Sequence, residues 1–280
     1  LALGVAEIIP GVSGSTVALL LGIYDDFIDL LYQGTQLAKA ILLFVIGKNS
    51  VQDVKKAWFN IRWQFGIFLG LGMVTAILSL SSFIVYLLLE LPFYLFAFLI
   101  GLTIPTMIIV FKQITKPNMK HALIGGVTAA VFLSLFIFGE GGGAVTNPHP
   151  LHLFLGGMLA ISAMVLPGVS GSFMLLILGL YNFVIGLVAN VQSGLSTDQI
   201  VSLLILLAGI VTGLFTSVRA LKWAFDTMRN ELMAFLLGLL AASWYVLWPF
   251  VRVVAIEHDE PVLEKVAISS FDSATIALII

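Results

Sequence analysis

The sequence predicts an all-α polytopic membrane protein built from two inverted repeats, and three observations lead to this prediction. Of the 280 residues, 60% are hydrophobic and only 10% are charged, whereas soluble domains carry about 25% charged residues. Apolar runs close to the roughly 20 residues that span a bilayer recur along the chain. The helix-breaking segment Pro10–Ser15, with the sequence PGVSGS, returns unchanged as Pro167–Ser172.

The same composition argues against several functional classes. The formal net charge is −2, and no basic patch is interleaved with aromatic residues, so no nucleic-acid partner is expected. The chain has no cysteine, which rules out disulfide and thiolate chemistry. Its four histidines are scattered without the spacing of metal ligands. We therefore predict no catalytic residue, no metal site and no cofactor other than a coupling proton or sodium ion.

Each copy of the repeated segment interrupts an apolar stretch. Proline removes a backbone donor and glycine favours non-helical geometry. At membrane depth, such breaks occur only where they are buried in protein or line a wet cavity. Residues 1–31 and 151–190 are therefore predicted to be two re-entrant broken-helix hairpins, with two broken spanning helices as the alternative.

The repeat extends beyond the six shared residues. The two copies align at an offset of 157 residues, from Pro10 to Pro167, with ten identities in fifteen positions. A weaker block that includes Gly72 and Gly209 aligns at an offset of 137. The smaller offset places an insertion in the first copy, and we assign it to the charged segment 37–60, interpreted as an interfacial connection. Each unit is then one hairpin followed by two spanning helices.

The predicted domain organisation follows from this alignment. The first repeat covers residues 1–111, a connecting loop and a transmembrane helix cover 112–138, and the second repeat covers 139–251. Residues 252–280 are predicted to be an outer loop and a C-terminal transmembrane helix that is cut short, because both ends of the chain look trimmed. The predicted spans are Trp63–Leu89, Phe93–Phe111, Ala122–Phe138, Ile200–Val218 and Leu232–Val251.

The distribution of Lys and Arg indicates the orientation of the two units, because these residues mark cytoplasmic loops. Residues 112–120 contain three lysines, whereas 139–150 contain no Lys or Arg. The aligned turns also differ, since Ser82, Val85 and Pro92 in the first unit correspond to Arg219, Lys222 and Arg229 in the second. One turn is uncharged and the other is basic, which indicates opposite orientations. Inverted repeats with discontinuous helices are typical of secondary transporters.

The broken segments have the composition of an anion site. A helix that starts there leaves its first N–H groups without intrahelical partners, at the positive end of the helix dipole. Glycine lets a ligand approach the backbone, and serine hydroxyls can donate. The predicted phosphate-binding residues are Gly11, Ser13, Gly14, Ser15, Thr16, Gly168, Ser170, Gly171 and Ser172. The structural alternative is that the serines only cap the helices and the glycines allow tight packing.

Three further charged features are functional candidates. Glu7 lies three residues before the first break and aligns with Met164. Because an intramembrane carboxylate is a functional hypothesis by default, we predict that Glu7 carries a coupling proton; the alternative is an interfacial position. Arg219 and Lys222 are interpreted as topology signals that could also attract a phosphate headgroup. The three aspartates within residues 25–29 are interpreted as a solvated interfacial face.

Four segments carry a resemblance to a known family: Glu7–Ser15, Leu21–Tyr24, Leu166–Ser172 and Leu178–Tyr181. They resemble the bacterial polyprenyl-phosphate transporter family, formerly a domain of unknown function, over nearly the whole chain. The resemblance implies a flippase of the bacterial inner membrane that returns undecaprenyl phosphate to the cytoplasmic leaflet for reuse in cell-wall synthesis. Its implied partners are the polyprenyl phosphate and membrane lipids, and the oligomeric state stays open, with a dimer as one option. Members often carry Gly-Gly-Thr where this chain has Gly14–Thr16, which keeps a small residue.

Two other functions remain as alternatives. A membrane lipid-pyrophosphate phosphatase would need a general base beside the serines, yet no histidine follows either motif, and Met164 stands where Glu7 does in the first copy. A small-anion channel or exchanger would also suit glycine- and serine-rich helix breaks. We therefore predict a transporter rather than an enzyme.

Overall fold

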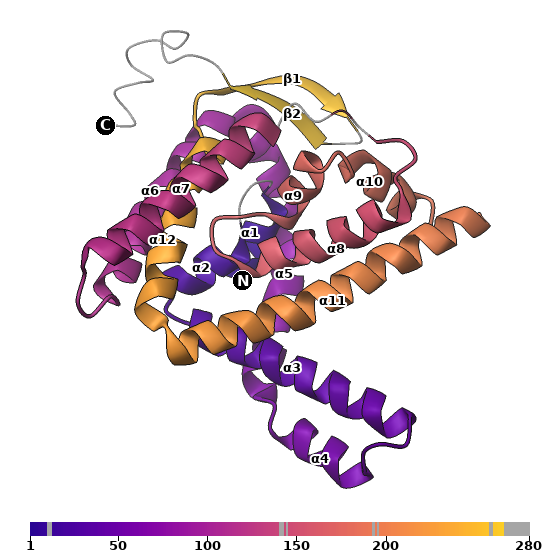
Figure 1. Ribbon diagram of the computed structural model, residues 1–280. Coiled ribbons are helices and arrows are strands. Elements are labelled where there is room, and N and C mark those ends of the chain that lie inside the picture. The colour runs from indigo at the N-terminus through magenta and orange to yellow at the C-terminus, as the bar shows by residue number, and fades with distance from the viewer. Residues whose placement is uncertain are drawn as a thin grey trace.

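The computed structural model is almost entirely helical, and it describes residues 1–9, 13–139, 143, 145–191, 194, 196–257 and 260–265. In this part of the chain twelve helices precede one β hairpin (Figure 1). The helices are α1 (Ala2–Ile8), α2 (Gly14–Leu20), α3 (Tyr24–Val45), α4 (Val51–Phe59), α5 (Trp63–Glu90), α6 (Pro92–Lys112), α7 (Met119–Gly139), α8 (Pro150–Val165), α9 (Gly171–Ile177), α10 (Tyr181–Ala189), α11 (Thr197–Thr227) and α12 (Arg229–Val246). The strands β1 (Val251–Glu257) and β2 (Glu260–Lys265) pair antiparallel.

The helices confirm the prediction that the chain is a multi-pass membrane protein. Among the described residues, five helices are long and apolar enough to cross a bilayer, namely α3, α5, α6, α7 and α11. Large apolar side chains lie exposed along them, such as Phe68 at 75% and Leu78 at 80% exposure on α5, as expected for surfaces that face lipid. The short helices α9 and α10 meet at an angle of 119° and together amount to one further broken span or a re-entrant loop.

The sequence repeat is also a repeat of backbone conformation. Helix α1 ends at Ile8 and α8 at Val165, while α2 and α9 each have seven residues and begin at equivalent glycines. Each short helix is followed by a left-handed glycine, Gly22 with φ +70° and Gly179 with φ +67°. The turns between the long helices match as well: Leu91 has φ −132° and ψ 40°, and Met228 has φ −140° and ψ 50°.

Helices α6 and α12, which follow those two turns, lie side by side and run antiparallel. Contacts along their length pair Phe93 with Phe250, Thr103 with Trp244 and Gln113 with Arg229. Helix α12 lies in the main hydrophobic core, where Met233, Leu236, Leu239 and Leu240 are fully buried. It packs against both α6 and α7, and α11 packs along α8 (Figure 1).

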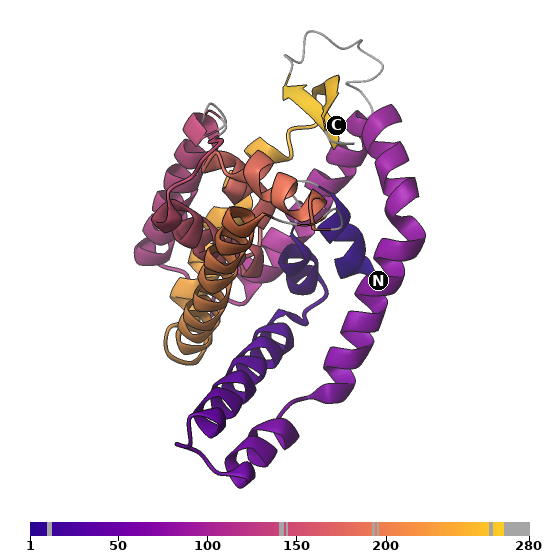
Figure 2. The ribbon, with the colours of Figure 1, turned by 90° about the vertical axis from the view of Figure 1, so that its right-hand side faces the viewer.

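The first unit differs from the predicted boundaries around residue 37. Helix α3 continues from Tyr24 to Val45, because no proline interrupts it, and Gly47 with φ +73° lies in the turn that follows. Only the short α4 and its flanking turns remain of the predicted interfacial segment. Figure 2 shows α3 and α5 as two arms that α4 joins at one end of the molecule.

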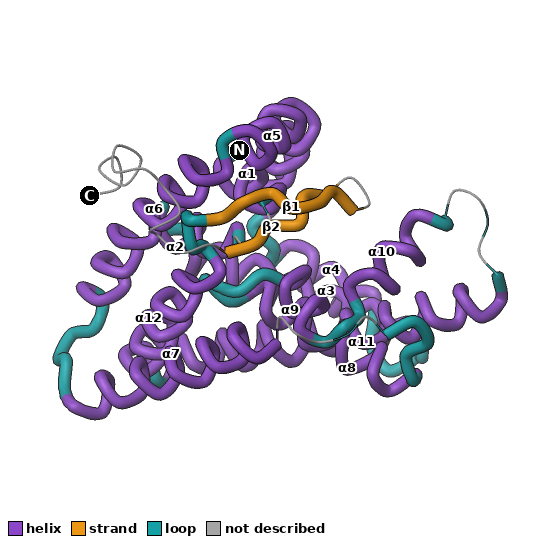
Figure 3. Tube along the Cα trace, turned by 90° about the horizontal axis from the view of Figure 1, so that it is seen from above, coloured by secondary structure: helices purple, strands orange, loops and turns teal. Residues whose placement is uncertain are grey.

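The end of the described chain also differs from the predicted boundaries. The span predicted over Leu232–Val251 stops at Val246, since Pro249 cannot continue a helix. The all-α prediction misses the β hairpin, which follows directly and lies across the helices when seen from above (Figure 3). The predicted C-terminal helix from Ser273 onward lies outside the described residues.

Candidate functional site

The first broken segment contacts the end of α8, just before the break in the second hairpin. Ser13 precedes α2, but its hydroxyl does not cap that helix. Instead, the Ser13 hydroxyl donates to the carbonyl oxygen of Met164 at 3.2 Å, and the Ser15 hydroxyl donates to the same oxygen at 3.3 Å. Both serines are buried, each with 2% exposure. Pro10 and Val12 lie outside the described residues, as does the predicted site residue Gly11.

These contacts have a clear cause in the break itself. The last carbonyl groups of a helix have no intrahelical partner, and α8 ends at Val165. The carbonyl oxygen of Met164 accepts from both serine hydroxyls, and the carbonyl oxygen of Val165 accepts from the buried Tyr24 hydroxyl at 3.0 Å. The hydroxyls of the first unit therefore cap the broken end of α8. The capping role that we considered for the serines is present, but the capped helix belongs to the other unit.

The two copies of the motif also touch directly. The Gly168 amide donates to the Thr16 hydroxyl oxygen at 2.8 Å. Pro167, Gly168 and Val169 are buried, and Gly168 has φ +84°. A Cβ atom at Gly168 would lie 3.1 Å from the carbonyl oxygen of Leu239 in α12. Only glycine fits this position without strain, so the residue type is explained by both conformation and packing.

The serines of the second motif are in a different state. Ser170 and Ser172 pair with each other at 2.8 Å, as Ser13 and Ser15 do at 2.5 Å, but Ser172 is exposed and Ser170 is half-buried. Within the described part of the chain, neither hydroxyl donates to a carbonyl of the first hairpin. The predicted phosphate-binding serines therefore divide into one buried, bonded pair and one accessible pair.

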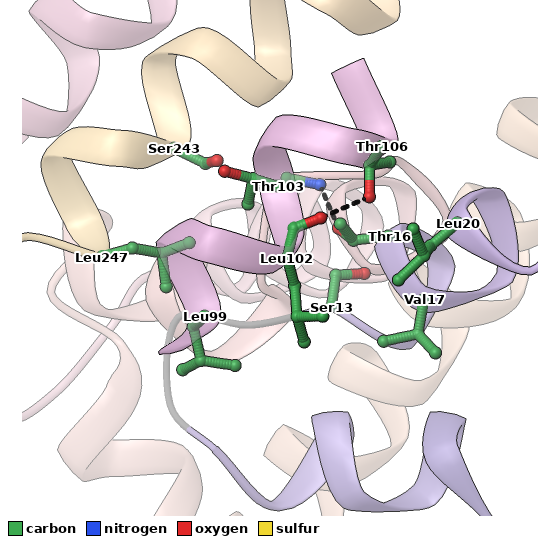
Figure 4. Close-up of a pocket in the computed structure, with 11 residues that line it drawn as sticks. Ser13, Thr16, Val17, Leu20, Leu99, Leu102, Thr103, Thr106, Ser243 and Leu247 are labelled. Atoms are coloured by element: carbon green, nitrogen blue, oxygen red, sulfur yellow. Dashed lines mark hydrogen bonds between the residues drawn. The ribbon is translucent and has the colours of Figure 1, made fainter. Parts of the chain in front are cut away.

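A small cavity borders the buried pair between α2, α6 and α12 (Figure 4). Its volume is about 30 Å³, which is room for about one water molecule. The hydroxyl groups in its wall are engaged, since Thr106 donates to Leu102 and Thr103 to Ile100. The cavity is too small for a phosphate group, so the site beside Ser13 and Thr16 is closed in this conformation.

Glu7 bridges the break in the first hairpin. Its Oε1 accepts a hydrogen bond from the Gly14 amide at 2.9 Å, and the side chain is half-buried. A Cβ atom at Gly14 would lie 2.5 Å from that oxygen, so glycine is needed for the contact. The second hairpin has no such bridge, because Met164 stands at the equivalent position.

The aspartates at the start of α3 are partly exposed, as predicted for a solvated face, but they are also ion-paired with other helices. Six side chains form the pairs: Asp25 with Arg229 at 2.7 Å, Asp29 with Lys222 at 3.0 Å, and Asp26 with Arg62. The sequence pattern could not show this, because the partners come from distant helices. We call the surface formed by Asp25, Asp26, Asp29, Arg62, Lys222 and Arg229 the basic-face cluster.

Lys222 and Arg219, the two basic candidates for headgroup attraction, differ in their ion pairing. Lys222 is also paired with Asp226 at 2.9 Å, so its charge is locally balanced. Arg219 is exposed and has no ion pair among the described residues. In the same part of the chain, no group of three acidic or histidine side chains is arranged to hold a metal ion.

Comparison with known proteins identifies the family. Residues 3–263 match the family described as VCA0040-like, undecaprenyl phosphate translocase-like. The chain belongs to this family. A polyprenyl-phosphate transporter of Vibrio cholerae serotype O1 is 31% identical over 99% of this chain and 85% of its own length. A polyprenyl-phosphate transporter of Staphylococcus aureus is 30% identical over 89% of this chain and 83% of its own length. No solved structure matches the chain.

Membership in the translocase-like family confirms the predicted resemblance and the prediction that the chain is a transporter and not an enzyme. Sequence reasoning missed the part that Tyr24 plays in joining the two units. The available signal was its identity with Tyr181 in the repeat alignment, which we read only as evidence of repetition.

Proposed function

We propose that this translocase-like protein transports a polyprenyl phosphate, such as undecaprenyl phosphate, across the bacterial cytoplasmic membrane. The hydrogen bond between Gly168 and Thr16 is the observation that carries the proposal. It brings together the two helix breaks that resemble the family's motif, inside a multi-pass membrane protein. Relatives named polyprenyl-phosphate transporters over most of the chain support the same cargo.

The two units are proposed to be inverted relative to each other. The antiparallel packing of α6 and α12, which follow equivalent turns in the two units, supports this arrangement. The ion pairs at the basic-face cluster support a cytoplasmic position for the start of α3 and for the α11–α12 turn, because basic residues mark that side. Residues 1–31 and 151–190 would then approach the membrane middle from opposite sides as re-entrant hairpins.

The phosphate head is proposed to meet the accessible motif first. Ser170 and Ser172 hydroxyls, now paired with each other, can turn to donate to phosphate oxygens, with Gly168 and Gly171 allowing close approach. Helices α2 and α9 have only seven residues, so hydroxyl donors rather than a helix dipole would supply most of the attraction. In the other half of the cycle the first motif would take the same role, through Gly11, Ser13, Gly14, Ser15 and Thr16.

The remaining parts of the cargo suit a membrane path. A polyprenyl tail is apolar and can stay in lipid while only the charged head passes between the hairpins. Transport is proposed to run from the outer to the cytoplasmic leaflet, which would return the carrier for cell-wall synthesis. Exposed Arg219, at the basic end of α11, would attract the arriving or departing head. Glu7, next to the first break, is proposed to carry a coupling proton.

Purified protein in liposomes tests the proposal. Undecaprenyl phosphate placed in one leaflet is expected to appear in the other only when the protein is present. The Ser170→Ala, Ser172→Ala double variant should lose this activity. Ser162→Ala is the matched control, because that hydroxyl bonds only to Met158 in its own helix. Phosphate release from a polyprenyl pyrophosphate, or flux of a small anion without lipid movement, would overturn the proposed function.

A further inference from the structure

The broken helix of the second unit is capped by the first unit, but among the described residues the broken helix of the first unit has no such cap from the second. In the first unit, Ser13, Ser15 and Tyr24 donate to the last carbonyl groups of α8. In the second unit, Ser170 and Ser172 share one hydrogen bond, as Ser13 and Ser15 do in the first, but within the described residues neither donates to a carbonyl group of the first unit. Yet the sequences of the two motifs are identical, and the short helices have the same bounds in the repeat. The difference therefore does not come from the six motif residues themselves, and it depends on how the two units pack against each other.

The repeat identifies where the missing contact would form. At the offset of 157 residues, Met164 corresponds to Glu7, so the equivalent acceptor is the backbone carbonyl of Glu7 near the end of α1. The helix ends have the same shape: Ile9 has φ −91° and ψ 118°, and Leu166 has φ −85° and ψ 134°. A hydroxyl pair that caps one of these ends has the geometry to cap the other.

We propose that the transport cycle exchanges the two caps. In the conformation described here, Ser13, Ser15 and Tyr24 cap α8, while within the described residues Ser170 and Ser172 cap no helix of the first unit. In the opposite conformation, Ser170 and Ser172 cap α1 through the Glu7 carbonyl, and Ser13 and Ser15 are released to the cargo. These five side chains are positioning residues, because each unit's hydroxyl groups hold the hairpin of the other unit. The inference rests on the proposed function and adds the contact that alternates.

The exchange has a physical advantage over simple opening. A buried carbonyl group that loses its only donor is costly, whereas a trade of one capped end for another leaves the number of hydrogen bonds nearly constant. The two conformations can then differ little in free energy, as a reversible carrier requires. At any moment one serine pair is bonded to protein and the other is available for a phosphate group.

The basic-face cluster favours the conformation seen here. Asp25 and Asp29 tie the start of α3 to Arg229 and Lys222 on the second unit. At the offset of 157 residues, the second unit has Asn182 and Gly186 instead. The opposite conformation therefore has no equivalent pair of carboxylates, and the resting protein is expected to keep Ser13 and Ser15 buried.

Thiol labelling can follow the exchange, because the chain contains no cysteine. Single Ser15→Cys and Ser172→Cys variants in liposomes report the two motifs separately. Without cargo, position 172 should label fast and position 15 slowly. Added undecaprenyl phosphate during turnover should speed labelling at position 15 and slow it at position 172.

Tyr24→Phe, made in the Ser15→Cys background, tests the cap without cargo. It removes the hydroxyl that donates to the Val165 carbonyl oxygen and keeps the ring, whose centroid lies 5.7 Å from that of Phe225. Loss of one net hydrogen bond corresponds to about a five-fold shift in an equilibrium, so labelling at position 15 should rise about five-fold. Tyr32→Phe is the matched control, because among the described residues its hydroxyl has no hydrogen-bond partner. Ser13→Ala should act like Tyr24→Phe and replaces it if that variant does not fold.

Two results overturn the exchange: equal labelling at position 15 in the Tyr24→Phe and Tyr32→Phe proteins, or a change in the same direction at both positions when cargo is added. Failure of the proposed function gives a different pattern. Undecaprenyl phosphate would then leave both labelling rates unchanged, while the effect of Tyr24→Phe, measured without lipid, would persist and support the cap.

Discussion

Replacement of Gly168 by alanine tests the meeting point of the two motifs most directly. Gly168 has φ +84°, a conformation that costs a residue with a side chain about 1–3 kcal/mol. The new Cβ atom would also lie 3.1 Å from the Leu239 carbonyl oxygen and 3.2 Å from its carbon. Both atoms belong to the backbone of a buried helix, so they cannot move aside cheaply. We expect a total destabilisation of roughly 2–4 kcal/mol.

Relief of this strain would pull Gly168 away from Thr16, and the hydrogen bond between the motifs would weaken with it. We therefore expect the Tm of the purified protein in detergent to fall by on the order of 5–10 °C. The fraction of Gly168→Ala protein that remains folded should transport undecaprenyl phosphate more slowly than wild type. A fluorescence melting curve and the liposome assay measure the two effects on the same preparation.

Gly101→Ala is the matched control for this experiment. Gly101 lies inside α6, where a Cβ atom would meet no other atom within 4 Å, and alanine is favoured over glycine in a helix by about 1 kcal/mol. The control should be at least as stable as wild type and equally active. If Gly168→Ala matches Gly101→Ala in both Tm and transport, the motifs do not depend on their close approach and the site as described is wrong.

Three further predictions follow from the site. Replacing Ser13 and Ser170 together by alanine should abolish transport while the protein still folds, and wild-type activity of that double variant in the liposome assay would sink the site assignment. Glu7→Gln keeps the acceptor at the first helix break but cannot ionise, so transport should lose its pH dependence without a large change in Tm; an unchanged pH profile would remove Glu7 from the coupling step. Asp29→Asn should weaken the basic-face cluster by about 0.2–1 kcal/mol and raise labelling at position 15, whereas Asp226→Asn, which removes only the Lys222 pair within α11, should leave it at the wild-type rate; equal labelling in the two variants would contradict the role of the Asp29 pair.

Local chemistry made part of the fold predictable. Proline, glycine and serine act within a few residues, so the two breaks could be located from the sequence, whereas the left-handed glycines after the short helices were seen only in the structure. Apolar length predicted α5, α6 and α7 closely, because a spanning helix depends on its own residues. Helix α11 continues nine residues past the predicted end at Val218, so Arg219 and Lys222 lie within the helix. The same reasoning placed the end of the first hairpin too early, since nothing in residues 31–37 stops α3.

Contacts between distant segments could not be predicted in this way. The partners of Asp25 and Asp29 lie about 200 residues further along the chain, and a charge pattern alone could not show that the solvated face is also ion-paired. Tyr24 looked like one more identity in the repeat, because its hydroxyl acquires a meaning only beside the end of α8.

By itself, the sequence determined that this is a membrane protein with two equivalent helix breaks that carry hydroxyl groups. Only the tertiary structure decided that one serine pair is buried on α8 while the other is accessible. The physical reason is that two identical motifs have identical local preferences. Which of them is capped depends on the packing of one unit against the other, and that packing is set by side chains far away in the chain.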